Sequence, residues 1–275
     1  MTLTVPTVAL SATTAIPQLG FGVYQVPDAE TTEAVGLALD AGYRAVDTAS
    51  AYGNEAGVGR ALAESSLSRD DVFVTSKLWI DSLERAAVRP ALEASLDRLG
   101  LDRLDLFLIH WPAPGLGRYV EAWEELVALR DAGLVREVGV SNFQPAHLAR
   151  LAETGVTPVI NQVELHPAFQ QRDLRAWHTE RGIVTQAWSP LGQGTVLADP
   201  VVVAVAEAHD VSPAQAVLRW HLQHGTVVIP KSATPARIAA NAEVFDFELT
   251  TAEMAQIDGL DAGGRIGPDP DTFNG

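Results

Sequence analysis

The sequence contains no cysteine, which excludes disulfide bonds, thiolate catalysis and cysteine-ligated metal sites. It also has no run approaching the roughly 18 apolar residues of a membrane-spanning helix. The opening residues, MTLTVPTVAL, lack the basic start and long apolar stretch of a signal peptide. We therefore expect a soluble, cytoplasmic protein that does not act at a membrane and holds no metal.

Positive charge is scarce, because 19 Lys and Arg residues face 35 Asp and Glu residues, for a formal net charge of −16. Such a chain repels nucleic acid and anionic membranes, and any anionic ligand must be held by local cations. Lysine is rarer still, since only Lys77 and Lys231 occur. An ammonium is compact and titratable, whereas a guanidinium is planar and always charged. The two lysines are therefore candidates for roles that arginine cannot fill, although codon bias can also produce this ratio.

Apolar residues make up 47% of the 275 residues, which is enough for a large core. Short runs rich in Val, Ile and Leu alternate with helical periodicity in segments such as 83–99, 120–130, 201–209 and 214–223. Eight such runs begin near Leu19, Arg44, Val72, Leu104, Glu137, Val159, Ile183 and Thr226. Runs of this kind suit parallel strands that are buried on both faces. Eight strand–helix units predict an α/β fold, a (β/α)8 TIM barrel, as a single domain over residues 1–275.

The two ends of the chain have a different character. The stretch VPTVALSATTAIPQLG alternates and turns around Ser11 to Thr14, which predicts an N-terminal β-hairpin that plugs the bottom of the barrel. The stretch DAGGRIGPDPDTFNG, after Leu260, is rich in Gly and Pro. It predicts an extended C-terminal tail.

Polar side chains stand where several predicted strands end. Asp47 ends the second strand, Lys77 the third and His110 the fourth, and Tyr52 lies in the loop after the second. The carboxyl ends of the strands of a barrel share one rim, and that rim carries the active site. Alone, each residue has a plain structural explanation, as a helix cap, a solvated charge or a packing group.

Together the four groups make a proton donor. A phenol has a pKa of about 10, so it is a poor acid at neutral pH unless its anion is stabilised. An ammonium at ~4 Å, such as Lys77, stabilises the phenolate of Tyr52 by roughly 4 kcal/mol at an effective dielectric constant of ~20. Asp47 is the counter-ion that a buried lysine needs, and His110 can orient a carbonyl beside the phenol.

The segments GYRAVDTASAYGNEAGVG, VTSKLW, LFLIHWP, VREVGVSNF, INQVELHP, AWSPLGQG and VVIPKS occur in this order. In combination they resemble the aldo-keto reductase family, and AWSPLGQG, PAQAVLRWHLQHG and EVFDFELT are most similar to its 2,5-diketo-D-gluconate reductase branch. The resemblance implies NADPH-dependent reduction of aldehydes and ketones, including small carbonyls and keto-sugar acids. It implies a catalytic tetrad of Asp47, Tyr52, Lys77 and His110, with Tyr52 as general acid.

No G-x-G-x-x-G motif follows a predicted strand, so a Rossmann-type dinucleotide site is not expected. The stretch VVIPKSATPARIAAN offers a point charge, a hydroxyl and a guanidinium at a helix start, in Lys231, Ser232 and Arg237. An ordinary capped helix start explains the same residues, but the resemblance implies a site for the 2′-phosphate of NADPH. Ala239 and Ala240 depart from the acidic residues common before Asn241 in the family, which puts the adenosine contacts in doubt.

The resemblance also implies cofactor contacts along the rim. Ser141, Asn142 and Gln162 would fix the nicotinamide carboxamide, and Trp188 would stack on the ring. The full set of cofactor contacts is Gly22, Val23, Tyr24, Asp47, Ser141, Asn142, Gln162, Trp188, Ser189, Leu191, Lys231, Ser232, Arg237 and Asn241.

Aromatic residues adjoin the tetrad on the side expected for substrate. Trp79 and Trp111 follow Lys77 and His110 closely, and with Tyr24 and Phe21 they are candidates for the wall of a pocket for small carbonyls. The substrate contacts implied are Tyr24, Trp79, His110 and Trp111.

Two other functions use the same residues differently. A nicotinamide-binding redox sensor or regulatory subunit would bind the cofactor without significant turnover. A barrel isomerase or aldolase would use Lys77 as a Schiff base, but it would leave Asp47, Tyr52 and the stretch from Lys231 to Asn241 without a joint role. A monomer is expected from the size of the chain and the resemblance.

Overall fold

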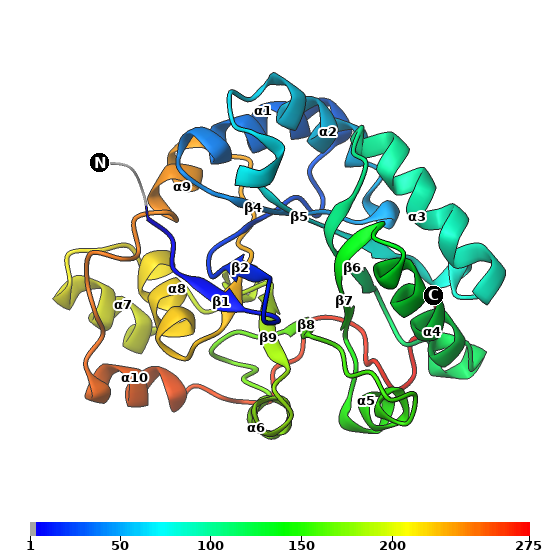
Figure 1. The fold of residues 1–275 in the computed structure, drawn as a ribbon. Coiled ribbons are helices and arrows are strands. Elements are labelled where there is room, and N and C mark those ends of the chain that lie inside the picture. The colour runs from blue at the N-terminus through cyan, green and yellow to red at the C-terminus, as the bar shows by residue number, and fades with distance from the viewer. Residues whose placement is uncertain (1–3) are drawn as a thin grey trace.

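The computed structural model describes residues 4–275 (Figure 1). Eight parallel strands form one sheet in the order β10-β9-β8-β7-β6-β5-β4-β3, and a parallel bridge between Leu19 and Val228 closes it into a barrel. The strands are β3 (Phe21–Gly22), β4 (Ala45–Asp47), β5 (Phe73–Leu78), β6 (Leu104–Ile109), β7 (Val135–Ser141), β8 (Ile160–Glu164), β9 (Val184–Trp188) and β10 (Val227–Val228). The predicted (β/α)8 barrel is confirmed.

Helices surround the strands in a ring (Figure 1). They are α1 (Asp28–Asp40), α2 (Glu55–Glu64), α3 (Arg85–Leu99), α4 (Tyr119–Asp131), α5 (Pro145–Ala152), α6 (Arg172–Glu180), α7 (Pro200–Ala208), α8 (Pro213–Gln223), α9 (Pro235–Ala240) and α10 (Thr251–Asp258). Local chemistry sets several boundaries. Ser212 and Gln215 form a reciprocal capping box at the start of α8, and Gly100 ends α3 in the left-handed conformation, with φ 65°.

The N-terminal hairpin closes the bottom of the barrel. Strands β1 (Thr7–Ala9) and β2 (Ala15–Pro17) pair in antiparallel register, as predicted. Leu10 and Ile16 from the hairpin share a buried cluster with side chains from the barrel strands. Those side chains are Ala45, Phe73, Leu106, Leu108, Ile160 and Val227. The hairpin thus replaces water at the end of the barrel opposite the strand carboxyl ends.

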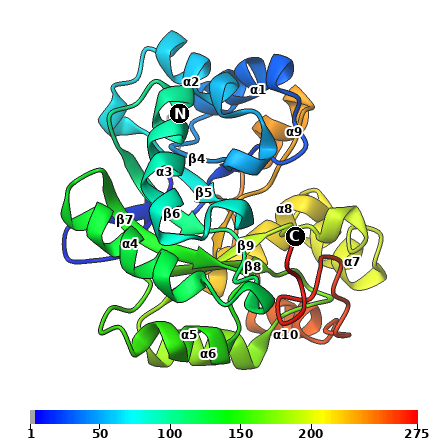
Figure 2. The same cartoon turned by 90° about the vertical axis from the view of Figure 1, so that its right-hand side faces the viewer.

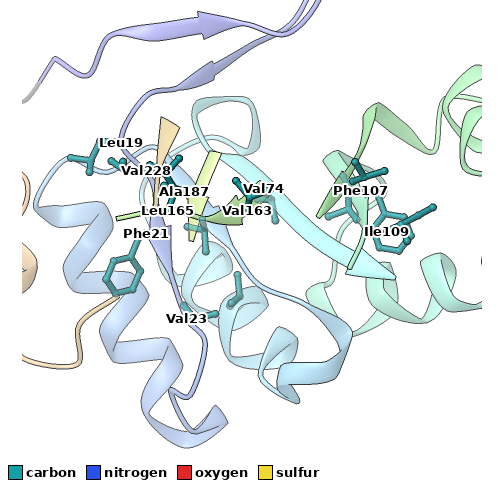
Figure 3. Close-up of a cluster of buried hydrophobic side chains, with 14 of the residues drawn as sticks. Leu19, Phe21, Val23, Val74, Phe107, Ile109, Val163, Leu165, Ala187 and Val228 are labelled. Carbon is teal, nitrogen blue, oxygen red and sulfur yellow. The ribbon is translucent and has the colours of Figure 1, made fainter. Parts of the chain in front are cut away.

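A second cluster lies between the strands and the helices (Figure 3). Leu19, Phe21 and Val23 all belong to it, because residues two apart on an extended chain point to the same side. Phe21 is 1% exposed and packs against Tyr43 with ring centroids 5.7 Å apart. The prediction that Phe21 lines the substrate pocket is therefore wrong.

The hairpin and the C-terminal tail lie at opposite ends of the barrel (Figure 2). After α10, residues 259–275 contain no helix or strand, as predicted, and they follow the rim where the strands end. No single helix in residues 4–275 is long and apolar enough to cross a membrane. Helices α7 and α8 reach that length and hydropathy only as a pair bent by 88°.

Candidate active site

The four candidate catalytic residues meet at the carboxyl ends of β4, β5 and β6. Asp47 is the last residue of β4, Lys77 lies near the end of β5, and His110 directly follows β6. Tyr52 ends a 3-10 turn, Ser50–Tyr52, that follows β4. Sequence positions spread over more than sixty residues thus converge because parallel strands end together.

Lys77 is fully buried, and each of its three N–H bonds has an acceptor. Its Nζ donates to Asp47 Oδ1 in a short ion pair, to the carbonyl oxygen of Thr48 at 2.9 Å and to Tyr52 Oη at 3.3 Å. Asp47 is 3% exposed, and its second oxygen accepts from Gln162 Nε2 at 2.7 Å. The ammonium is therefore held rigidly, with one donor directed at the phenol.

The phenol of Tyr52 is not acidified in the way that the sequence suggested. Burial raises its pKa well above the ordinary value, and the nearby Asp47 carboxylate raises it further. Burial and the Asp47 carboxylate together outweigh the stabilisation that Lys77 offers to the phenolate. Tyr52 therefore keeps its proton at neutral pH. Its oxygen accepts from Lys77, while no residue among 4–275 takes the hydroxyl proton.

His110 presents a neutral imidazole. Burial, and then the charge of Lys77, hold its pKa well below the ordinary value. Neither ring nitrogen has a hydrogen-bond partner among the described residues, and Nδ1 is fully buried. The ring lies edge-on to Tyr52, with centroids 5.6 Å apart. A neutral imidazole beside the phenol can donate one hydrogen bond to a carbonyl oxygen without bringing a charge.

Aromatic side chains surround these groups. Tyr24 lies 5.0 Å from Tyr52 between ring centroids, and Trp79 lies 5.0 Å from His110. Tyr24 is 54% exposed and Trp79 is half-buried, whereas Trp111 is only 7% exposed. Trp111 packs against Phe273 of the tail at 4.6 Å. Three of the four aromatic wall candidates thus border the tetrad or the tail, and Phe21 does not.

The candidates at the ends of β7, β8 and β9 bind one another. Asn142 Nδ2 donates to the carbonyl oxygen of His110 and to Ser141 Oγ, both at 3.0 Å, and its Oδ1 accepts from Trp188 Nε1 at 2.8 Å. Gln162 Nε2 donates to Asp47 and also to Gln186 Oε1, at 2.8 Å. One network therefore runs from Trp188 to His110, and another from Gln186 to Asp47.

The backbone at this rim bends sharply. Asn142 and Ser189 adopt left-handed conformations, with φ 64° and 48°, directly after β7 and β9. Such conformations are costly for residues other than glycine and are frequent at functional sites. Ser189 and Leu191 are half-buried in the loop after β9.

The first strand supplies two buried candidates. Val23 is fully buried, and a Cβ on Gly22 would lie 2.9 Å from the carbonyl oxygen of Ile229. Barrel closure alone therefore accounts for a glycine at position 22.

The cationic candidates lie after β10. Lys231 and Arg237 are exposed, and no carboxylate in residues 4–275 forms an ion pair with either, although the chain carries a net charge of −16. Ser232 and Asn241 are buried, and Ser232 Oγ accepts from the Thr234 N–H at 3.0 Å just before α9. An exposed pair of cations without acidic partners among the described residues is suited to a phosphate.

Comparison with known proteins identifies the family. Residues 18–262 match the sequence model of the aldo/keto reductase family. An aldo-keto reductase of Mycobacterium sp. (strain KMS) is 53% identical over 270 residues, which cover 98% of each chain. The chain belongs to the aldo/keto reductase family. Methylglyoxal reductase DkgA of Escherichia coli is 52% identical over 263 residues, 94% of this chain and 95% of that protein.

Among solved structures, a Gox0644 mutant in complex with NADPH superposes on this aldo-keto reductase with a TM-score of 0.94 and 46% identity. The match covers 98% of this chain and 99% of the other. The aldo/keto reductase of Brucella melitensis superposes with a TM-score of 0.91 and 49% identity, over 94% of this chain and 100% of that one.

The sequence did not point to two residues of this aldo-keto reductase site. Gln186 holds Gln162 in place, and Glu164, buried at the end of β8, binds the tail. Glu164 stands two residues after Gln162 on the same strand. Residues two apart on a strand point to the same side, so the position of Glu164 relative to Gln162 was the sequence signal that could have placed it at the site.

Proposed function

We propose that this chain reduces small aldehydes and ketones with NADPH, using Tyr52 as the general acid. The observation that carries the proposal is the buried ammonium of Lys77, which Asp47 holds and which donates to Tyr52 Oη beside an unpartnered imidazole. A protonated phenol and a neutral imidazole converge there on the position that a carbonyl oxygen would take. Neither group brings a net charge to the substrate.

The chain's own residues account for each requirement of the reaction. Bound NADPH supplies the hydride. His110 donates a hydrogen bond to the carbonyl oxygen and orients it. Tyr52 then transfers its proton as negative charge develops on that oxygen, which is a much stronger base than a phenolate. Lys77 stabilises the resulting phenolate at 3.3 Å, so the high pKa of the resting phenol does not block the step.

The residues present fit the cofactor. Lys231 and Arg237 are exposed cations without acidic partners in residues 4–275, and they suit the 2′-phosphate. Trp188 is half-buried and is held by Asn142, so its ring is fixed as a platform for the nicotinamide. The NADPH complex of Gox0644 supports the same cofactor here.

Small α-dicarbonyls are the first substrates to test. DkgA relatives are named methylglyoxal reductases, and the aromatic side chains of Tyr24, Trp79 and Trp111 suit a small, uncharged carbonyl group. Keto-sugar acids such as 2,5-diketo-D-gluconate form the second class. We propose that the enzyme acts as a monomer in the cytoplasm, which size-exclusion chromatography with light scattering and cell fractionation would test.

The deciding experiment compares wild type with Tyr52→Phe across a panel of carbonyls, by the loss of NADPH absorbance. Phe keeps the ring but removes the proton donor, so we expect kcat to fall by roughly 10²–10⁴ while the Kd for NADPH is retained. Equal loss of turnover and NADPH binding would make the role of Tyr52 structural. Tight NADPH binding without turnover in wild type would favour a redox sensor or regulatory subunit.

Cofactor preference has its own test. Lys231→Met and Arg237→Met remove the exposed charges and should raise KM for NADPH by roughly tenfold each, with little effect on NADH. Equal kcat/KM for NADPH and NADH in wild type would contradict the phosphate assignment.

A further inference from the structure

The C-terminal tail is attached along its length, first through the N–H groups of Ala262 and Gly264, which donate to the carbonyl oxygen of Ala168, and two further attachments lie beside the site. Near its end, Phe273 packs on Trp111, and Asn274 Oδ1 accepts a hydrogen bond from the N–H of Gly115 at 2.7 Å. These contacts bring the end of the chain next to His110, which directly precedes Trp111. The other attachment lies closer to α10, at the end of β8.

That attachment is made by Glu164. Its side chain is fully buried, and its two carboxylate oxygens accept hydrogen bonds from consecutive backbone N–H groups of the tail, Ile266 at 2.6 Å and Gly267 at 2.7 Å. His166 Nε2 lies 3.1 Å from Oε1. No Lys or Arg in residues 4–275 forms an ion pair with this carboxylate. Two of the three groups that hold this buried anion therefore belong to the tail.

The hydrogen bonds affect the charge state of Glu164. Burial opposes ionisation, yet the hydrogen bonds from His166, Ile266 and Gly267 outweigh it and lower the pKa of Glu164. The carboxylate is therefore charged at neutral pH, when both tail N–H groups bind it most strongly.

Gly267 is closely fitted between Glu164 and Trp188. A Cβ at this position would lie 2.5 Å from Cη2 of the Trp188 ring and 3.0 Å from Oε2 of Glu164. At its other edge, the same indole donates from Nε1 to Asn142 Oδ1. The ring of Trp188 is thus confined between Asn142 and the tail backbone, and only glycine leaves room for this approach.

We propose that Glu164 is a positioning residue: together with Ile266 and Gly267 it forms a tail latch that fixes the tail against Trp188 and across the substrate side of the site. The proposal rests on the proposed carbonyl reduction. The latch acts on the affinity for carbonyl substrate, because the tail it holds ends on Trp111 beside His110. The exposed cations Lys231 and Arg237 lie on a different segment, after β10, so the latch leaves their contribution to NADPH binding intact.

The rate of trypsin cleavage measures whether the latch holds the tail, and this measurement does not depend on carbonyl reduction by the protein. The bond between Arg265 and Ile266 is a trypsin site, and the N–H of that very bond is held by Glu164. A protease must draw the bond into its own cleft, so the intact latch slows cleavage. In Glu164→Gln the carboxamide has nearly the same volume, but it loses the charge and can turn an NH2 group toward the tail N–H groups. Mass spectrometry measures the release of residues 266–275. We expect this release to be roughly tenfold faster in Glu164→Gln than in the wild type, because the variant loses one charge-assisted hydrogen bond.

Two further variants separate the latch from general instability. Gly267→Ala leaves Glu164 intact but forces a methyl group against Trp188, and it should expose the same bond. Glu180→Gln makes the same chemical change at an exposed residue of α6 and should leave cleavage after Arg265 unchanged. If Glu164→Gln fails to fold, Gly267→Ala carries the test, and cleavage after other Arg residues reports any general unfolding.

Kinetics then show what the latch does. Glu164→Gln should raise KM for the carbonyl by roughly tenfold, with kcat and the Kd for NADPH changed by less than about threefold, and Gly267→Ala, whose methyl group presses on the Trp188 ring, should raise the same KM. Unchanged cleavage after Arg265 in both variants would overturn the latch. Faster cleavage with an unchanged KM would overturn its role in substrate binding. An inactive wild type would refute the proposed function and the KM effect with it, while the proteolysis result would still decide whether the latch exists.

Discussion

Replacing Asp47 with Asn tests the buried ion pair that organises the site. Lys77 is fully buried, and burial lowers its pKa while the Asp47 carboxylate opposes that shift. Without the carboxylate, the folded protein must either bury an uncompensated ammonium or release its proton. Releasing the proton at pH 7 from a lysine with an unfolded pKa of about 10.4 costs about 5 kcal/mol, which sets the upper limit of the destabilisation. The amide of Asn would also direct N–H groups at Gln162 Nε2, which donates to Asp47 in the wild type.

The destabilisation caused by Asp47→Asn should decrease as pH rises. In Asp47→Asn the folded state holds a neutral Lys77 and the unfolded state a charged one, so the unfolded state binds more protons and stability rises with pH. The destabilisation relative to wild type should shrink by about 1.4 kcal/mol per pH unit, from about 5 kcal/mol at pH 7 to about 2 kcal/mol at pH 9. Urea unfolding followed by tryptophan fluorescence at both pH values measures it.

The double variant Asp47→Asn/Lys77→Met is the control. Replacing the lysine with an apolar side chain of similar length removes the unpaired charge, so the double variant should be more stable at pH 7 than Asp47→Asn alone. The stability of the double variant should also lack the pH dependence that Lys77 adds in Asp47→Asn. A penalty that is the same at pH 7 and pH 9 would mean that Lys77 stays charged in the folded variant, whereas a double variant no more stable than the single one would show that the account of a charge-compensated lysine is wrong.

Two further predictions concern stability. Burial lowers the pKa of His178 to about 4 and that of His221 to about 3, so each is neutral when folded but becomes protonated when unfolded below about pH 6.5. Stability should fall as pH drops from about 6.5 to 4, by about 3 kcal/mol per histidine at pH 4, and a flat urea-midpoint profile over this range would contradict it. Gly59→Ala in α2 would place a Cβ 2.4 Å from the Leu99 carbonyl oxygen and should destabilise by about 1–3 kcal/mol. Gly36→Ala in α1 meets nothing within 4 Å and should stabilise by about 0.5–1 kcal/mol, so equal melting shifts in the two variants would refute the packing argument.

The sequence was sufficient to predict the barrel and the meeting of the tetrad. Asp47, Lys77 and His110 each stand at the end of an apolar run, and in a parallel barrel such ends share one rim. No three-dimensional detail was needed beyond this rule. The hairpin plug followed in the same way from alternation and a turn near the N-terminus.

Other features depend on distances that a sequence does not contain. The pKa of Tyr52 is raised by burial and by the nearby Asp47 carboxylate, so the predicted acidification had the wrong sign. Phe21 was assigned to the wrong side because its strand has only two residues, too few to reveal alternation. Glu164 binds backbone N–H groups about a hundred positions later, and backbone partners leave no trace in residue identity.

The closure of the barrel has a consequence for the order in which the protein can form. The seam joins the first strand to the last, through the bridge between Leu19 and Val228 and hydrogen bonds from Gly20 N–H to Val228 O at 2.8 Å and from Val228 N–H to Gln18 O at 2.9 Å. During synthesis, the edge that begins at Gln18 stays open until residue 228 has left the ribosome. Pairing across the seam is therefore a late event on the nascent chain. Chains stalled before β10 should remain open sheets, exposed to chaperones and to edge-to-edge association, however well their earlier strands have assembled.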